Sequence, residues 1–239
     1  MPGVERLDGV EALEGVGSGF AATRDGIDTM LRDRGLRRTS PDLTAESLLR
    51  GAHASAVLAG SVSTIDQVRA GEGDAVAQSA LRVSVELLGL APVLTRSPLQ
   101  ALARIHSLAA AGSTPDDEVG RPRDAEAAAR LREVVGLLGS DRPALVTAAL
   151  VHAELVAGTP FGSADGLVAR AVERLVLVSS GLDAKSLVVP EAGHLALRAA
   201  YESNLRAYAD GGRAGLQAWL LYCTEAYAAG AEASPLRDR

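Results

Sequence analysis

The chain has 239 residues, of which 47% are hydrophobic and 3% are aromatic, and its formal net charge is −6. This length and apolar content can fill the core of one large helical domain or of two small ones. An acidic chain without a basic stripe cannot neutralise a phosphate backbone, so we do not expect a nucleic-acid partner. The single cysteine, Cys223, excludes an internal disulfide and is typical of a buried thiol in a reducing cytoplasm.

The spacing of apolar residues predicts an all-α fold, because Ala, Leu, Arg and Glu recur three and four residues apart and alternation is rare. Residues 1–40 are expected to form a helical or flexible N-terminal extension, with a flexible turn at "GVGSG", residues 15–19. Residues 41–232 are expected to form one helical domain, followed by a disordered tail at 233–239. Inside the domain the pattern predicts helices over 44–60, 64–70, 73–90, 97–111, 124–138, 143–157, 165–180, 191–210 and 213–230.

The N-terminus does not resemble a targeting signal. It carries acids where a signal peptide needs a basic region and an apolar core, and no apolar run approaches the roughly 18 residues of a membrane span. We therefore expect a cytoplasmic protein with no membrane partner. The densest basic run, "LRDRGLRR" at 31–38, is interrupted by Asp33 and is interpreted as a solvated helix end.

Common enzyme motifs are missing. "GVGSGF" has Phe20 where a dinucleotide fingerprint needs its third glycine, and "GSADG" does not have the spacing of a nucleophile elbow. There is no Walker A lysine motif and no paired-cysteine zinc spacing. Two aromatic helical faces are interpreted as core packing; they consist of Tyr201, Asn204, Leu205 and Tyr208, and of Trp219, Tyr222, Cys223 and Tyr227.

The segment "GTPFGSADGLVAR", residues 158–170, lies between two apolar helical stretches. Gly158 suits a left-handed turn after the first helix, and Ser163 or Asp165 could cap the second. The amide groups of such a glycine-containing loop can bind an anion at a helix N-terminus. Alternatively, the two polar residues only cap a buried helix, and the carboxylate of Asp165 would repel a phosphate unless a metal bridged them.

Residues 159–170, "TPFGSADGLVAR", resemble the signature of the Fic family, H-P-F-x-(D/E)-G-N-G-R-x-x-R, which lies between two core helices. The chain keeps the Pro, the Phe, the second Gly and the last Arg of the signature, as Pro160, Phe161, Gly166 and Arg170. It departs from the signature at five positions. Thr159 stands at the catalytic His, Ser163 at the acid that binds magnesium, Ala164 at the first Gly, Asp165 at the Asn, and Leu167 at the first Arg.

The resemblance extends through the flanking helices and covers about residues 40–230. It implies a Fic-like helical bundle with a small flap in 112–123. The segment "SAVLAG", Ser55 to Gly60, resembles the inhibitory helix of the family, (S/T)-x-x-x-E-(G/N), with Ala59 in place of the Glu. It is therefore expected to pack near the loop, with Ala59 toward Arg170.

Fic enzymes typically transfer AMP from ATP to a protein hydroxyl, with the signature His as base and the acid holding magnesium. Thr159 cannot accept a proton at neutral pH. His152 lies seven residues earlier, about 10.5 Å along a helix, which is too far to replace the base. His53, His106 and His194 are interpreted as surface or satisfied core residues.

We therefore expect a Fic-fold pseudoenzyme with no catalytic residue, no metal site and no required cofactor, which acts through a protein partner. A weak site for ATP or another nucleotide with Mg²⁺ is expected at Pro160, Phe161, Gly162, Ser163, Ala164, Asp165, Gly166 and Arg170. One alternative is an atypical nucleotidyl- or phosphotransferase that uses Asp165 or another base. Another is an antitoxin-like regulatory subunit, and the sequence also allows a homodimer.

Overall fold

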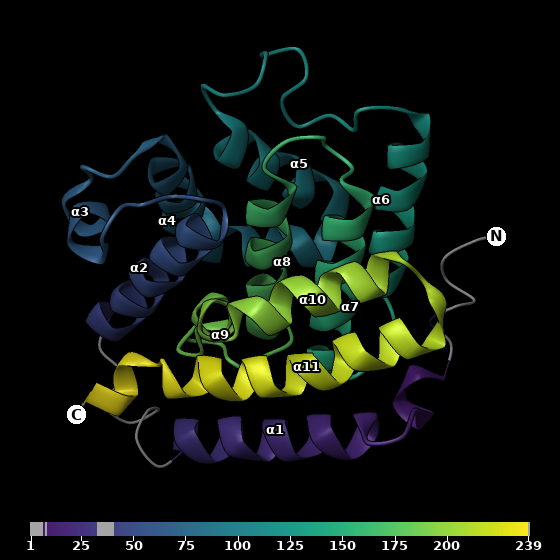
Figure 1. Ribbon diagram of the computed structural model, residues 1–239. Helices are drawn as coiled ribbons and strands as arrows, with labels where there is room; N and C mark the ends of the chain where they lie inside the picture. Colours follow the sequence, from purple (N-terminus) through teal and green to yellow (C-terminus); the bar gives the residue numbers. More distant parts are fainter. Residues whose placement is uncertain (1–6, 8, 33–40, 239) are drawn as a thin grey trace.

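Figure 1 shows the computed structural model, which describes residue 7, residues 9–32 and residues 41–238. The secondary structure of these residues is helical and contains no strand, so the predicted all-α fold is confirmed. The elements are η2 (Val10–Ala12), α1 (Val16–Met30), α2 (Pro41–Leu58), α3 (Ile65–Ala70), α4 (Ala75–Arg96), α5 (Pro98–Ala110), α6 (Ala125–Leu138), α7 (Ala144–Gly158), α8 (Asp165–Ser179), α9 (Pro190–Ala196), α10 (Arg198–Ala209), α11 (Gly212–Glu232) and η4 (Pro235–Asp238).

Helices α7 and α8 form the centre of the molecule and make the most extensive helix contact in it. Helix α7 is apolar on every side and is buried along nearly its whole length, so it has to be covered all round. Helices α4 and α5 pack on α8, α6 packs on α7, and α10 and α11 cover the other side (Figure 1). The loop between the two central helices is the Fic-like segment, as the sequence predicts.

The N-terminal helix belongs to the same core. Helix α1 lies alongside α11 (Figure 1), and its side chains, among them Phe20, join the central hydrophobic cluster. The expected flexible turn at 15–19 is wrong, because only Gly15 adopts a left-handed conformation and the helix begins at the next residue. A Cβ at Gly19 would lie 3.1 Å from Thr224 of α11, so this glycine permits close helix packing. Most of the basic run at 31–38 lies outside the described residues.

Most helix ends lie within about three residues of the prediction, and two helices differ from it by more. Helix α4 continues through Pro92 to Arg96 instead of ending at 90. A proline removes one helical hydrogen bond, but the apolar face continues to the buried Leu94, and its burial favours a longer helix. The predicted helix 191–210 is divided at Leu197, which lets α9 pack on α2 and α11 while α10 covers α7.

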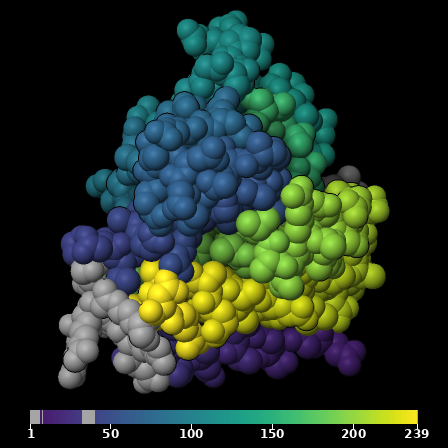
Figure 2. All heavy atoms as spheres, turned by 60° about the vertical axis from the view of Figure 1, so that its left-hand side comes forward, coloured from purple at the N-terminus to yellow at the C-terminus, as the bar shows by residue number. Residues whose placement is uncertain are grey.

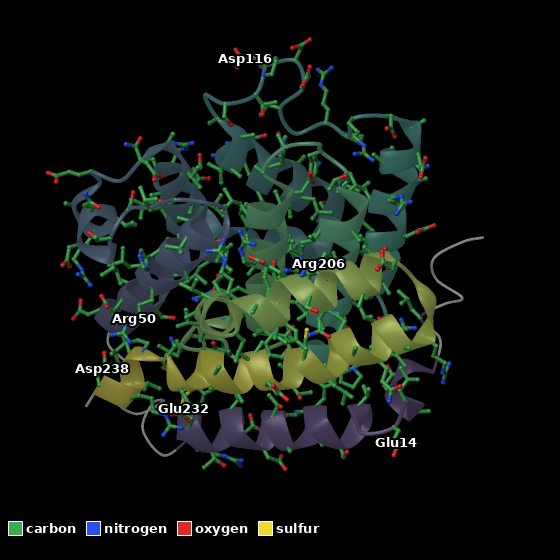
Figure 3. The ribbon with its side chains drawn as sticks, viewed as in Figure 1. Glu14, Arg50, Asp116, Arg206, Glu232 and Asp238 are labelled. Atoms are coloured by element: carbon green, nitrogen blue, oxygen red, sulfur yellow. The ribbon has the colours of Figure 1, made fainter. Side chains whose placement is uncertain are left out.

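The C-terminal residues are ordered, in contrast to the predicted disordered tail. Residues 235–238 form η4, in which Leu236 is buried. Arg50 of α2 donates a hydrogen bond of 3.1 Å to the carbonyl of Ala233 and forms an ion pair with Asp238 (Figure 3). These contacts hold the last described residues against α2.

Residues 112–123 project from the body of the molecule above the central loop, with Asp116 near the tip (Figures 2 and 3). The segment consists of turns and bends, so it occupies the place of the expected flap without forming strands. Helix α4 has the length and composition of a membrane span, although charged and polar residues interrupt its apolar sequence. It packs against α2, α5 and α8, as a helix of a protein core does.

Candidate functional site

The loop between α7 and α8 is tightly turned. Thr159 has a φ of 38° and Ala164 a φ of 53°, so two residues with a Cβ adopt the left-handed region. The sequence predicts this conformation for Gly158, but Gly158 is the last helical residue. A Cβ there would lie 3.3 Å from Cδ of Arg130, so the glycine makes room for a side chain of α6.

Asp165 turns its carboxylate back into the loop. Neither Ser163 nor Asp165 caps α8, because the N-cap position is Ala164 and no side chain bonds to the first turn. Instead, Oδ1 of Asp165 accepts a hydrogen bond of 3.0 Å from the amide of Phe161, and the amide of Gly162 also bonds to this carboxylate. Burial raises the pKa of Asp165. The carboxylate therefore occupies amides that could otherwise bind an anion.

Ser163 lies between two side chains of the preceding segment. Its Oγ is 3.2 Å from Nε2 of His106 and 2.9 Å from Oγ1 of Thr114. The amide of Gly120 donates to Nδ1 of His106 at 2.8 Å, and burial lowers the pKa of this histidine. The ring is therefore neutral with its proton on Nε2, and it donates to Ser163. A histidine in this tautomer cannot act as base for the serine, so the pair is not an activated nucleophile.

The hydroxyl of Thr159 is also hydrogen-bonded. Its Oγ1 accepts a hydrogen bond of 2.7 Å from Nη1 of Arg123, and the amide of Arg123 donates to the carbonyl of Pro160 at 2.9 Å. The end of the projecting segment 112–123 is therefore fastened to the start of the loop. The position that resembles the family His holds a hydroxyl that accepts a hydrogen bond and offers no base.

Arg170 is buried, and three of its nitrogens are hydrogen-bonded. Nε donates to Oγ of Ser55 at 2.8 Å, Nη2 donates to the carbonyl of Ser55 at 3.0 Å, and Nη1 donates to the hydroxyl of Tyr201 at 3.2 Å. A Cβ at Gly166 would lie 3.2 Å from Nη1, so this glycine leaves room for the guanidinium beneath the first turn of α8. The segment that resembles the inhibitory helix thus packs on Arg170, and its inhibitory role stays a prediction.

A cavity of about 610 Å³ opens beside this arginine. Its walls come from the end of α2, the start of α4, the end of α5 and the start of α8, and they include Ala59, Arg82, Asp165 and Arg170. Arg82 donates to the carbonyls of Leu108 and Ala111 and to Oγ of Ser79. Among the described residues, neither guanidinium forms an ion pair, so the cavity is lined by two cations and one buried carboxylate, that of Asp165.

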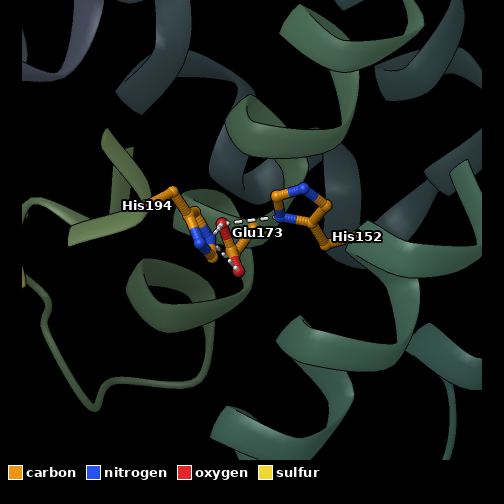
Figure 4. Close-up of side chains that lie close together, drawn as sticks. All are labelled: His152, Glu173 and His194. Atoms are coloured by element: carbon orange, nitrogen blue, oxygen red, sulfur yellow. Dashed lines mark hydrogen bonds and ion pairs between the residues drawn. The ribbon is translucent and has the colours of Figure 1, made fainter. Parts of the chain in front are cut away.

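Sequence reasoning missed a buried polar cluster below the loop. Figure 4 shows Glu173 of α8 between His152 of α7 and His194 of α9, and all three side chains are fully buried. His194 is a satisfied core residue, as expected, because both of its ring nitrogens have hydrogen-bond partners. His152 is also a core residue, but its Nδ1 has no well-formed hydrogen bond. The sequence patterns assign no role to Glu173. Glu173 lies among apolar positions in the middle of α8, beside the equally buried Arg170 and Arg174. Charged residues at such positions are the signal that could have found the cluster, because buried charges need buried partners.

The comparisons with known proteins identify the fold. No family model matches the sequence, and no curated protein matches it. The crystal structure of a Fic family protein from Desulfovibrio desulfuricans G20 has a TM-score of 0.70 at 16% sequence identity, covering 88% of this chain and 73% of that protein. Similarity at this low identity establishes the architecture and no more. The chain has the Fic fold.

Proposed function

We propose that this chain is a Fic-fold protein without transfer activity, which binds a small anionic ligand in the cavity beside Arg170 and acts in the cytoplasm through a protein partner. The proposal rests on two features found together: the amides of the loop are already hydrogen-bonded, and the cavity next to the loop is lined by two cations. Asp165 fills the loop amides, while Arg82 and Arg170 face the cavity with neutral hydrogen-bond partners only.

The loop supports the absence of transfer chemistry. A general base typically contributes about 10² to 10⁴ in rate, and Thr159, whose hydroxyl accepts from Arg123, cannot supply one. Ser163 is a neutral side chain hydrogen-bonded to His106, where a magnesium site needs a carboxylate. Leu167 has no charge to stabilise developing negative charge on phosphate oxygens.

The cavity supports binding of an anion. Its volume of about 610 Å³ is within the usual range for small-molecule sites. Ala59 stands where the resemblance implies an inhibitory glutamate, so the wall formed by α2 contributes no carboxylate there. Because guanidinium groups suit phosphate geometry, pyrophosphate and nucleotides are the first ligands to test.

Ligand-dependent melting tests the binding part. ATP and inorganic pyrophosphate, each with and without Mg²⁺, are expected to raise the melting temperature of the unmodified protein. The increase should be lost in Arg82→Gln and retained in Arg96→Gln, which alters an exposed arginine at the other end of the same helix. Because a ligand at 100 times its Kd stabilises by about 2.7 kcal/mol, the absence of any increase at millimolar ligand would contradict an anion site.

Incubation with labelled ATP tests the absence of chemistry. We expect no labelling of the unmodified protein or of a general protein acceptor, compared with a Thr159→His, Ser163→Asp, Leu167→Arg variant. The buried Asp165, whose pKa is raised, is the one loop group that favours the alternative of an atypical transferase. Labelling by the unmodified protein that disappears in Asp165→Ala would establish that alternative.

A further inference from the structure

The polar cluster beneath the loop joins five elements of the core. It consists of His152 of α7, Arg170 and Glu173 of α8, His194 of α9, Tyr201 of α10, and Tyr222, Cys223 and Tyr227 of α11. Each of these side chains is at least nine-tenths buried. Buried groups of this kind need a complete set of donors and acceptors, so the direction of each hydrogen bond can be worked out from its neighbours.

The chain of bonds begins at Arg170, which can only donate. Its Nη1 donates to the hydroxyl oxygen of Tyr201, so the Tyr201 proton is left to bond elsewhere. Nε2 of His152 lies 2.9 Å from that hydroxyl and is the acceptor for it. His152 must then carry its proton on Nδ1, which lies 2.9 Å from Oε2 of Glu173.

The contact between His152 and Glu173 is close but bent. The distance is that of an ion pair or hydrogen bond, yet the oxygen lies off the direction in which an Nδ1–H would point, so Nδ1 lacks a well-formed hydrogen bond. The charge of the carboxylate decides the tautomer. An Nδ1 lone pair at 2.9 Å from a carboxylate would be repelled, whereas an Nδ1–H is attracted even when the angle is poor.

The other partners of the carboxylate also donate to it. The hydroxyl of Tyr227 donates to Oε1 at 2.8 Å, and Nε2 of His194 lies 3.0 and 3.2 Å from the two oxygens (Figure 4). Nδ1 of His194 is 2.8 Å from the hydroxyl of Tyr222, which can donate to it. With His194 protonated on Nε2, each of these bonds has one donor and one acceptor, and both rings are neutral.

We infer that Glu173 is the buried counter-charge of Arg170 and a positioning residue for it, acting through Tyr201 and through His152 held as the Nδ1–H tautomer. The guanidinium and the carboxylate are then the two charges of one hydrogen-bonded chain. Burial would raise the pKa of Glu173, but the facing histidines lower it, which agrees with an ionised carboxylate. This inference is independent of the proposed ligand, because the chain is complete without one.

A metal ion is the competing occupant, since two histidines and a carboxylate with atoms within 4.8 Å of one another form a common ligand set. The contacts favour hydrogen bonds. Nε2 of His194 points at both oxygens of Glu173 at ordinary hydrogen-bond distances, and an ion bound at about 2.0 to 2.2 Å from nitrogen and oxygen would have to displace those contacts.

Nitrogen NMR of the unmodified protein tests the assignment directly. Long-range ¹H–¹⁵N correlation spectra distinguish the two neutral tautomers of an imidazole. At pH 7 we expect His152 to be protonated on Nδ1 alone and His194 on Nε2 alone. The opposite tautomer at His152, a doubly protonated ring, or stoichiometric Zn²⁺ or Co²⁺ in the purified protein would overturn the inference.

Removing the guanidinium tests the coupling of charge. In Arg170→Met the carboxylate loses its counter-charge, and we expect the pKa of His152 to rise, because Arg170 lowers it in the unmodified protein. Arg82→Met is the matched control, since Arg82 faces the same cavity without touching Tyr201. The coupling would be contradicted if the pKa of His152 changed equally in both variants, or if it did not change in Arg170→Met.

A second variant covers the case in which Arg170→Met does not fold. Tyr201→Phe keeps the ring and removes the hydroxyl that links Arg170 to His152. The ¹⁵N shift of Nε2 of His152 should then move toward the value of an acceptor without a donor, while His194 keeps its signal. An unchanged His152 signal would show that Tyr201 does not donate to it.

Discussion

Replacement of Gly193 by alanine should destabilise the protein strongly, because α9 crosses α11 at this glycine. A Cβ built on Gly193 would lie 1.9 Å from the carbonyl oxygen of Ala226 and 2.8 Å from the amide nitrogen of Gly230. Real Cβ contacts are essentially never shorter than 3.0 Å, and both neighbouring atoms belong to the backbone, so no side-chain rotation can relieve the overlap. The helices must separate by about 1 Å, a shift of the size that overpacked cores undergo.

The size of the loss in stability follows from the hydrogen bonds that this separation would break. His194, the next residue, is 2.8 Å from the hydroxyl of Tyr222 and 3.0 Å from Oε2 of Glu173, and a shift of about 1 Å takes such bonds beyond hydrogen-bond range. Each buried group left without a partner costs about 1 to 3 kcal/mol, in addition to about 1 to 3 kcal/mol for overpacking. We therefore expect a loss of about 3 to 5 kcal/mol in the free energy of unfolding.

Thermal and urea unfolding, followed by circular dichroism, measure this effect. For a chain of this length about 2 to 4 °C is lost per kcal/mol, so the melting temperature should fall by roughly 10 °C. Gly89→Ala is the control, because that helical glycine of α4 is exposed and a Cβ added to it would meet no atom within 4 Å. The control should gain about 0.5 to 1 kcal/mol from the restricted backbone. A Gly193→Ala protein that melts within about 2 °C of the unmodified one would refute the reasoning.

Three further changes test the polar core and the loop. Glu191→Gln should lower the free energy of unfolding by about 3 to 5 kcal/mol in urea titrations, because it leaves the buried guanidinium of Arg174 without its carboxylate; a loss below about 1 kcal/mol would contradict this. Because the pKa of Glu173 is lowered by folding, its contribution to stability is present above its ordinary pKa of 4.5 and lost as the pH falls below it. The melting temperature should therefore decline more steeply below that pH than it does in Glu173→Gln. Ser163 should not react with a fluorophosphonate probe, because His106 donates to it; labelling that Ser163→Ala removes would show that the tautomer assignment is wrong.

Much of the architecture could be predicted from the sequence because it depends on near neighbours along the chain. Helix positions follow from apolar residues three and four apart, so nearly every predicted helix is present. The loop between α7 and α8 was also predictable, since two long apolar stretches flank a glycine-containing segment. Local signals failed where packing outweighed them, as at Pro92, which lies inside α4, and at Gly15 to Gly19, most of which is helical.

In the candidate site, too, some features can be predicted from the sequence and others depend on the tertiary structure. The loss of a base at Thr159 and the retention of Arg170 can be read from residue types alone. The direction of the Asp165 carboxylate could not, because a cap on its own helix and a bond to the amide of Phe161 are both compatible with the sequence. The conformation of the loop between α7 and α8, and the left-handed Ala164 in particular, therefore decides which backbone amides are left to bind a ligand.

Only the tertiary structure brought together the partners of Glu173. His152 is 21 residues before it and His194 is 21 residues after it, on different helices, and Tyr227 is 54 residues away. Sequence periodicity places each of these residues on the buried side of its helix. It does not fix how the helices cross, which depends on close contacts such as that of Gly193 with α11. A hydrogen bond needs its atoms placed within a few tenths of an ångström, and only the packing of whole helices sets positions that finely.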